Sequence, residues 1–119
     1  MKNIKVYLSH SIRGKYGPKA TDEQMKANCQ RAINFVEMLR ETCPFLQIHC
    51  PAEMEGFVAT AYKMKVLSER QILNVDCEIV RQSDFLLVYS PDNVISKGMQ
   101  VEIDFARKHK ITTIYWFKS

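Results

Sequence analysis

The sequence lacks the two features that would send a protein into or across a membrane. No apolar run approaches the roughly 20 residues that a membrane-spanning helix needs. The N-terminal segment MKNIKVYLS lacks the apolar core of about 7–15 residues and the small-residue cleavage site of a secretory signal. We therefore expect a cytoplasmic protein that has no membrane partner.

Metal-binding and redox motifs are also missing. The four cysteines, at positions 29, 43, 50 and 77, form no C-x-x-C pair, so the sequence indicates neither a zinc site nor a redox motif. We expect reduced structural thiols, and no metal or other cofactor.

A strongly basic face is absent as well. The formal net charge of +4 is mild, and the lysines and arginines are scattered along the chain. A nucleic-acid binder usually carries a basic face with interleaved aromatic side chains. We expect no nucleic-acid partner, whereas a small anionic ligand such as a phosphate is compatible with this charge balance.

The stretch Asp84–Arg107 is the part around which the chain is organised. Phe85–Tyr89 is an unbroken apolar run that ends at the turn residues SPDN of positions 90–93. A run of that length is typical of a strand buried on both faces of a parallel sheet. The loop after such a strand lies at the sheet edge where open α/β folds bind ligands.

A helix is predicted directly after this loop. Residues 99–110 contain neither proline nor glycine, and Met99, Ile103 and Ala106 share one helical face. Glu102 lies at the edge of that apolar stripe, in the expected first turn. An acid there can point over the edge of the sheet, and we interpret Glu102 as the reactive group.

The first half of the chain predicts strand, helix and strand. Residues 4–9 are rich in β-forming residues, and residues 10–18 form a loop that is closed by glycine and proline. Thr21 and Gln24 make a capping box for a helix that Pro44 ends, and residues 45–49 form the second strand. The helix has one core face: Met25, Cys29, Ala32, Ile33, Val36 and Leu39.

The middle of the chain is less regular. Pro51 and Gly56 favour a loop, although residues 57–67 can form a short helix. Three apolar side chains here are candidates either for one wall of a pocket or for ordinary packing: Phe57, Tyr62 and Met64.

A second capping box, Ser68 with Gln71, begins a helix that runs to about Gln82. Asp76 falls in the middle of its apolar face. A carboxyl group among apolar neighbours is paired, protonated or directed into a cavity, so Asp76 is either a structural hydrogen-bonding residue or a functional one. The other members of that face are Ile72, Val75, Ile79 and Val80.

With a last strand at residues 111–117, four strands alternate with helices, and there is no internal repeat or linker. This pattern predicts a single domain over residues 1–119, an α/β three-layer sandwich with a flavodoxin-like parallel sheet of order 2-1-3-4. The loops 10–14 and 90–98 would then meet across one crevice.

Three segments together resemble the nucleoside 2-deoxyribosyltransferase superfamily. They are KVYLSHSIRG near the N-terminus, Asp76 with the later SDFLLVYS, and the pattern S-x-G-x-x-x-E-x-x-x-A from Ser96 to Ala106. The SIRG of residues 11–14 looks most like the 2'-deoxynucleoside 5'-monophosphate N-hydrolases. His10 is a departure, because the family commonly has glycine or alanine there.

The resemblance implies cleavage of the N-glycosidic bond of a nucleotide. Glu102 would be the nucleophile at C1', Asp76 would hold or protonate the leaving base, and Tyr7 would lie near the sugar. Carboxyl groups suit this reaction, because a carboxylate stabilises and can trap an oxocarbenium-like state while a second acid helps the base to leave. The 5'-phosphate would be held by Ser11, Ile12, Arg13, Gly14, Ser96 and Gly98.

Several of these residues have a plainer alternative role. Ser96 can simply cap the following helix, Arg13 can be an exposed loop charge, and Tyr7 can be packed in the core. Three functions also stay open. A hydrolase of (deoxy)nucleoside 5'-monophosphates is favoured by Arg13, and the alternatives are a deoxyribosyltransferase and a non-catalytic nucleotide-binding module.

Further expectations concern the site itself. We expect the carboxyl groups of Asp76 and Glu102 to open into one pocket, about 5–5.5 Å apart as in retaining glycosidases. The helix dipole would favour ionised Glu102 and burial would favour protonated Asp76, which would make them nucleophile and acid. We also expect a homodimer, because the site would otherwise be rather open.

Overall fold

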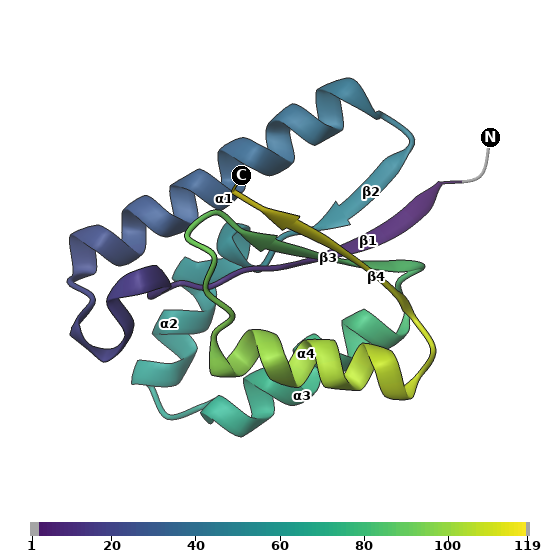
Figure 1. Ribbon diagram of the computed structural model, residues 1–119. Helices are drawn as coiled ribbons and strands as arrows, with labels where there is room; N and C mark the ends of the chain where they lie inside the picture. Colours follow the sequence, from purple (N-terminus) through teal and green to yellow (C-terminus); the bar gives the residue numbers. More distant parts are fainter. Residues whose placement is uncertain (1–2, 119) are drawn as a thin grey trace.

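The computed structural model describes residues 3–118, and its centre is a parallel sheet of four strands in the order β2-β1-β3-β4 (Figure 1). The predicted three-layer α/β sandwich with a flavodoxin-like strand order is therefore confirmed. The strands are β1 (Ile4–Ser9), β2 (Leu46–His49), β3 (Phe85–Ser90) and β4 (Thr112–Phe117).

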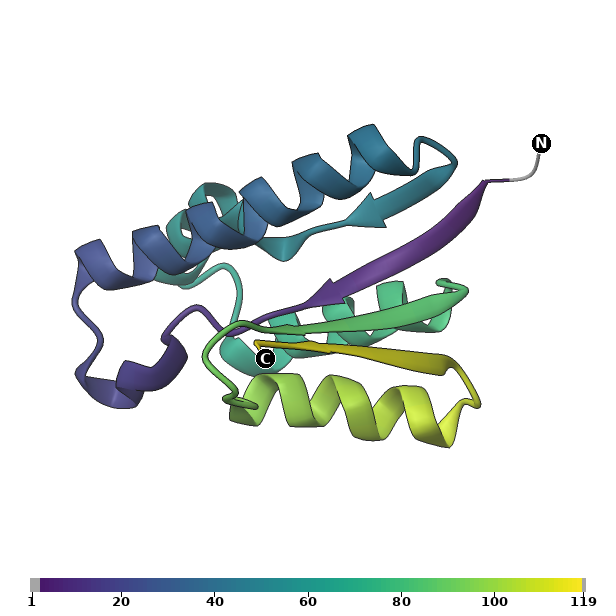
Figure 2. The same ribbon diagram turned by 45° about the horizontal axis from the view of Figure 1, so that its top comes forward.

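Helices cover the two faces of the sheet unequally. The long helix α1 lies over one face, and α3 and α4 lie side by side over the other (Figures 1 and 2). The helices are α1 (Asp22–Thr42), α2 (Glu55–Lys63), α3 (Glu69–Arg81) and α4 (Lys97–Lys108), with the 3₁₀ segments η1 (Gly14–Lys19) and η2 (Pro51–Met54).

Both predicted capping boxes are present and begin α1 and α3. The Thr21 hydroxyl accepts from the Gln24 amide at 3.1 Å, and the Gln24 side chain accepts from the Thr21 amide at 2.9 Å. Ser68 and Gln71 make the same pair of bonds at 3.1 and 2.7 Å. Each box satisfies two of the amides that a helix start leaves without intrahelical partners.

The alternation of side chains along β1 divides the core into two parts. Val6 and Leu8 pack toward α1, whereas Tyr7 packs toward α3 and α4. Ser9 continues the second set, since its hydroxyl reaches Glu102 on α4. The strand therefore delivers two polar side chains to the face that α4 covers.

One detail of the predicted helices is wrong. Val75 is 56% exposed rather than part of the core face, because with Asp76 turned inward it lies about 100° further round α3. Residues 51–63, for which a loop and a short helix were both open, form a 3₁₀ turn followed by α2. The side chains suggested for a pocket wall point to solvent because α2 packs mainly on η2; exposed fractions are 71% for Phe57, 54% for Tyr62 and 69% for Met64.

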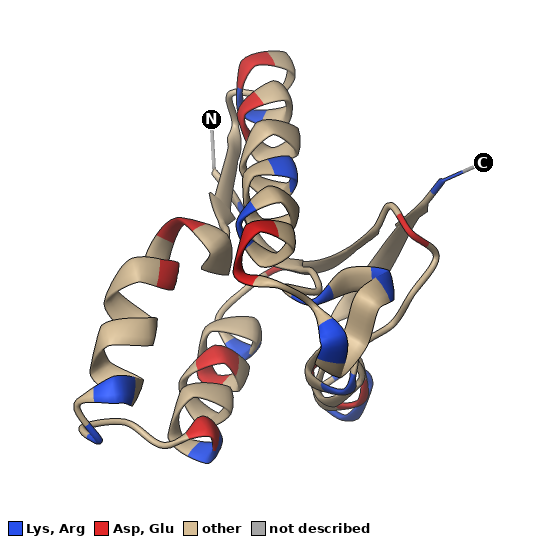
Figure 3. Cartoon of the chain, turned by 90° about the vertical axis from the view of Figure 1, so that its left-hand side faces the viewer, with Lys and Arg blue, Asp and Glu red and all other residues tan. Residues whose placement is uncertain are grey.

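Figure 3 shows acidic and basic residues interspersed along the helices. Within residues 3–118, no helix combines the length and apolar character needed to cross a membrane.

Candidate active site

Glu102 is a buried acid held by two hydroxyl groups. It is only 6% exposed, its Oε2 accepts a hydrogen bond from the Tyr7 hydroxyl, and its Oε1 accepts one from the Ser9 hydroxyl at 2.7 Å. Tyr7 and Ser9 are themselves fully buried. The three groups lie where the carboxyl half of β1 meets α4. Parallel sheets bind their ligands at the carboxyl ends of the strands.

The local sequence explains why Glu102 points at β1. Met99, Ile103 and Ala106 are buried against the sheet, and Glu102 shares their side of α4. The sequence predicted that Glu102 lies in the first turn of this helix. The helix begins at Lys97, however, so Glu102 lies in its second turn. A helix dipole acts mainly within the first turn, so it offers Glu102 less stabilisation than expected.

The electrostatics also differ from the expected division of roles. Burial raises the pKa of Glu102 to about 7, although the Tyr7 and Ser9 hydroxyls oppose the change. Burial likewise raises the pKa of Asp76 to about 6, opposed by the nearby Tyr7 hydroxyl. Both carboxyls therefore favour the protonated form more than usual.

Tyr7 connects the elements of the site. Burial and the charges of Glu102 and Asp76 raise the pKa of Tyr7 far above its ordinary value, so its hydroxyl stays protonated and acts as a donor. Its ring stacks on the His49 ring at a centroid distance of 5.4 Å. The end of β2 thus helps to fix the ring that holds Glu102.

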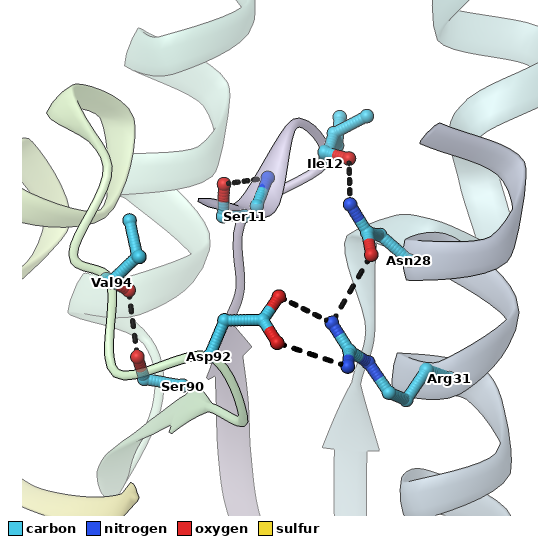
Figure 4. Close-up of polar contacts among 8 residues, drawn as sticks. Ser11, Ile12, Asn28, Arg31, Ser90, Asp92 and Val94 are labelled. Carbon is cyan, nitrogen blue, oxygen red and sulfur yellow. Dashed lines mark hydrogen bonds and ion pairs between the residues drawn. The ribbon is translucent and has the colours of Figure 1, made fainter. Parts of the chain in front are cut away.

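The loop after β1 is held by its own hydrogen bonds and by α1. The Ser11 hydroxyl accepts from the Gly14 amide at 2.8 Å, and Asn28 donates to the Ile12 carbonyl at 2.9 Å. Figure 4 shows Asn28 reaching the loop from α1. Ser11, Ile12 and Gly14 therefore have structural partners within the loop region.

A salt bridge ties the loop after β3 to α1 in the same region (Figure 4). Arg31 donates to the two carboxylate oxygens of Asp92 at 2.8 and 3.3 Å, and to the Asn28 oxygen at 3.1 Å. The Arg31 guanidinium lowers the pKa of Asp92. The loops after β1 and β3 consequently meet through α1, as the strand order predicts.

Two hollows lie beside these loops. The smaller has a volume of about 10 Å³ and is lined by residues of both loops together with Asn28, Arg31 and Tyr89. The larger, of about 250 Å³, is lined by Lys15, Tyr16, Gln24, Ala27, Asn28, Arg31 and Asp92. Neither Asp76 nor Glu102 lines either hollow, so a pocket common to the two carboxyls stays a prediction.

The other residues suggested for phosphate binding differ in their contacts and exposure. Ser96 caps α4 by accepting from the Met99 amide at 3.2 Å, as the plainer reading expects. Arg13 is exposed and has no ion pair within residues 3–118. A Cβ added at Gly98 would meet only Leu73, at an ordinary 3.9 Å, so packing does not require glycine there.

The sequence analysis did not identify four polar residues of this region. Ser9 could have been found, because it lies two positions after Tyr7 on a strand and so shares its face. Asn28, Arg31 and Asp92 gave no comparable signal. Asn28 and Arg31 are ordinary residues of a polar-faced helix, and Asp92 belongs to a turn, until folding brings them together.

We predict that Gly14→Ala destabilises the fold through a clash with Asn28. Gly14 has φ +58°, and an added Cβ would lie 2.7 Å from the Asn28 amide nitrogen. In an Asn28→Ala background the cost of Gly14→Ala should fall by about 1 kcal/mol, as is common for coupled neighbours. Urea denaturation of the single and double variants measures this.

Gly17→Ala is the control for this cycle. Gly17 also has a positive φ of 57°, but nothing lies within 4 Å of an added Cβ. Its cost should therefore be the same with and without the Asn28 side chain. A Gly14→Ala cost that is equally insensitive to Asn28 would contradict the proposed close approach.

Comparison of the chain with protein-family models, with curated proteins and with solved structures finds no match.

Proposed function

We propose that the protein is a nucleotide N-glycosidase that hydrolyses a (deoxy)nucleoside 5'-monophosphate to a free base and a sugar 5-phosphate. The observation that carries the proposal is the buried Glu102 carboxyl, which accepts hydrogen bonds from the hydroxyls of Tyr7 and Ser9 at the carboxyl half of the central strand β1. Burial of an acid is costly, and costly placements of titratable groups gather at functional sites.

The hydroxyls of Tyr7 and Ser9 suit a nucleophilic role for Glu102. They orient the carboxyl and, because they donate to it, stabilise its ionised form against burial. In the proposed reaction a Glu102 oxygen bonds to C1' while the N-glycosidic bond breaks and its electron pair leaves with the base. Water then attacks C1', releasing the sugar phosphate and the Glu102 carboxylate.

Asp76 is the proposed proton carrier. It is half-buried, and its pKa of about 6 lets the protonated form be present near neutral pH. It would give its proton to the departing base and recover one from the attacking water. The Tyr7 hydroxyl, which donates to Glu102, also lowers the pKa of Asp76 against the effect of burial.

The direct test is incubation of the protein with matched sets of nucleosides and nucleoside 5'-monophosphates, followed by chromatography for free base. We expect base release from at least one monophosphate and much less from its nucleoside, because Arg13 and the donors of the β1 loop suit an anionic ligand. Base exchange only in the presence of a second base would indicate a transferase instead. Binding without any release of base would indicate a non-catalytic module.

A homodimer also stays a prediction. It is supported by the apolar side chains that β4 exposes at the edge of the sheet, since large exposed apolar patches mark interfaces. They are Ile114, Tyr115, Trp116 and Phe117, each between 40% and 49% exposed. Sedimentation showing a fully active monomer at micromolar concentration would contradict it.

A further inference from the structure

His10 has the unusual property that both of its ring nitrogens are buried and without a hydrogen-bond partner. Within residues 3–118, no other buried side-chain nitrogen or oxygen is in this state. Buried polar groups nearly always have partners, because leaving one without a partner costs stability. A buried group in this state can bond a water molecule or an atom of a ligand.

His10 is one of the residues that line the small cavity between the loops that follow β1 and β3. The cavity volume of about 10 Å³ is near the minimum that holds one water molecule, and one oxygen atom of a ligand is of the same size. Its other lining residues include Asn28, Arg31 and Tyr89, which lie on the α1 side of the sheet. The cavity is therefore separate from Glu102, which belongs to α4 on the opposite side.

The charges around the cavity suit an anionic group. The charged residues that line the cavity itself are Arg31 and Asp92, which neutralise each other as an ion pair, whereas Lys15 lines the adjoining hollow and adds one positive charge there. Lys15 also lowers the pKa of Asp92. The 250 Å³ hollow shares Asn28, Arg31 and Asp92 with the cavity and offers room for the rest of a ligand.

We propose that this cavity accepts one oxygen of a phosphate group, and that a ring N–H of His10 donates a hydrogen bond to it. The ligand class is a phosphate monoester, and identifying it as the substrate's own 5'-phosphate rests on the proposed function. Such a phosphate would be held from the α1 side as well as by the loop residues that the sequence suggested.

The protonation state of His10 supports this geometry. Burial lowers the pKa of His10 to about 4, so the ring is neutral near pH 7. A neutral imidazole carries one N–H and one bare nitrogen. It can therefore donate to a phosphate oxygen without adding a buried charge to the free protein.

The experiment measures binding by calorimetry in a Glu102→Gln background, which prevents turnover. The ligands are inorganic phosphate, a deoxynucleoside 5'-monophosphate and the matching nucleoside. His10→Phe should weaken monophosphate binding by about tenfold, the typical loss for one hydrogen bond to a charged group, and should leave nucleoside binding unchanged. His10→Asn or His10→Gln should restore part of the loss, because their amides place an N–H near Nδ1 or Nε2 respectively.

The same variants have an opposite expected effect on the free protein. His10→Phe removes two buried polar atoms without partners, so its melting temperature should rise. A merely structural histidine would behave differently, since its loss would lower stability and weaken all ligands alike. His109→Phe is the matched control, because His109 is the exposed C-cap of α4 and its ring centroid lies 4.2 Å from that of Phe105.

The outcomes separate this inference from the proposed function. Inorganic phosphate that binds in a His10-dependent way supports the phosphate site even if no nucleotide is hydrolysed, and it identifies the source as free phosphate. Monophosphate binding that is unaffected by His10→Phe, or lost equally for the nucleoside, overturns the inference even if hydrolysis occurs. Failure of every phosphate-bearing ligand to bind overturns it as well.

Discussion

Glu102→Gln should lower the rate of N-glycosidic cleavage by at least about a thousandfold, or roughly 4 kcal/mol in the activation barrier. A glutamine oxygen can still accept from Tyr7 or Ser9, so the fold and the nucleotide site should persist. Glutamine cannot, however, form the proposed glycosyl ester. Single-turnover assays of base release, with binding measured in parallel, test the expectation.

Two further variants make this result specific. Asp104→Asn changes an exposed acid on the same helix, two residues from Glu102, and should keep the full rate. Asp76→Asn should slow the reaction less than Glu102→Gln and change its pH profile, because it removes the proposed proton carrier. Mass spectrometry of protein quenched during turnover should find the sugar on Glu102. A fully active Glu102→Gln protein would refute the assigned nucleophile.

Glu102→Gln should also produce a large pH-dependent gain in stability. Glu102 has a pKa of about 7 when folded against 4.5 for an unperturbed glutamate. Between these values the folded protein keeps a proton that the unfolded chain has lost, so Glu102 contributes progressively less stability as the pH rises. Relative to wild type, the free energy of unfolding of Glu102→Gln should therefore increase by about 3 kcal/mol from acid to mildly alkaline pH.

The difference between variant and wild type is the informative quantity. Burial lowers the pKa of His10 to about 4, so the cost of burying His10 falls as the pH rises from there to its ordinary value, and this change partly masks Glu102 in the wild-type curve. Urea denaturation at several pH values, with Asp104→Asn as the control, isolates Glu102. A difference that stays constant with pH would show that the folded protein does not raise the pKa of this acid.

Much of the fold follows from local signals in the sequence. The apolar run Phe85–Tyr89 predicted the buried strand β3, and the two capping boxes marked the starts of α1 and α3 within a residue. These signals work because caps and buried strands depend on neighbouring residues in the chain. The strand order then followed from the rules for alternating strands and helices.

The polar contacts of the site did not follow in the same way. Arg31 meets Asp92 across 61 positions of sequence, and nothing near either residue specifies the partner. The second-turn position of Glu102 depended on whether α4 begins at Lys97 or two residues later, a boundary that composition alone leaves open. The missing partners of His10 are a property of packing, which no pattern in the sequence reveals.

The wide sequence separation of the site has a consequence for how the protein is made. Tyr7 and Ser9 lie 95 and 93 residues before Glu102. In the sheet, β1 pairs with β2 through pairs such as Ile4 with Leu46, and with β3 through pairs such as Val6 with Phe85, which are further apart in the sequence. A chain emerging from the ribosome can thus form the β1–β2 pair early, whereas contacts of high separation in sequence must wait. The acid and the two hydroxyls that hold it can meet only after α4 has left the exit tunnel, so the candidate site forms later than the β1–β2 pair.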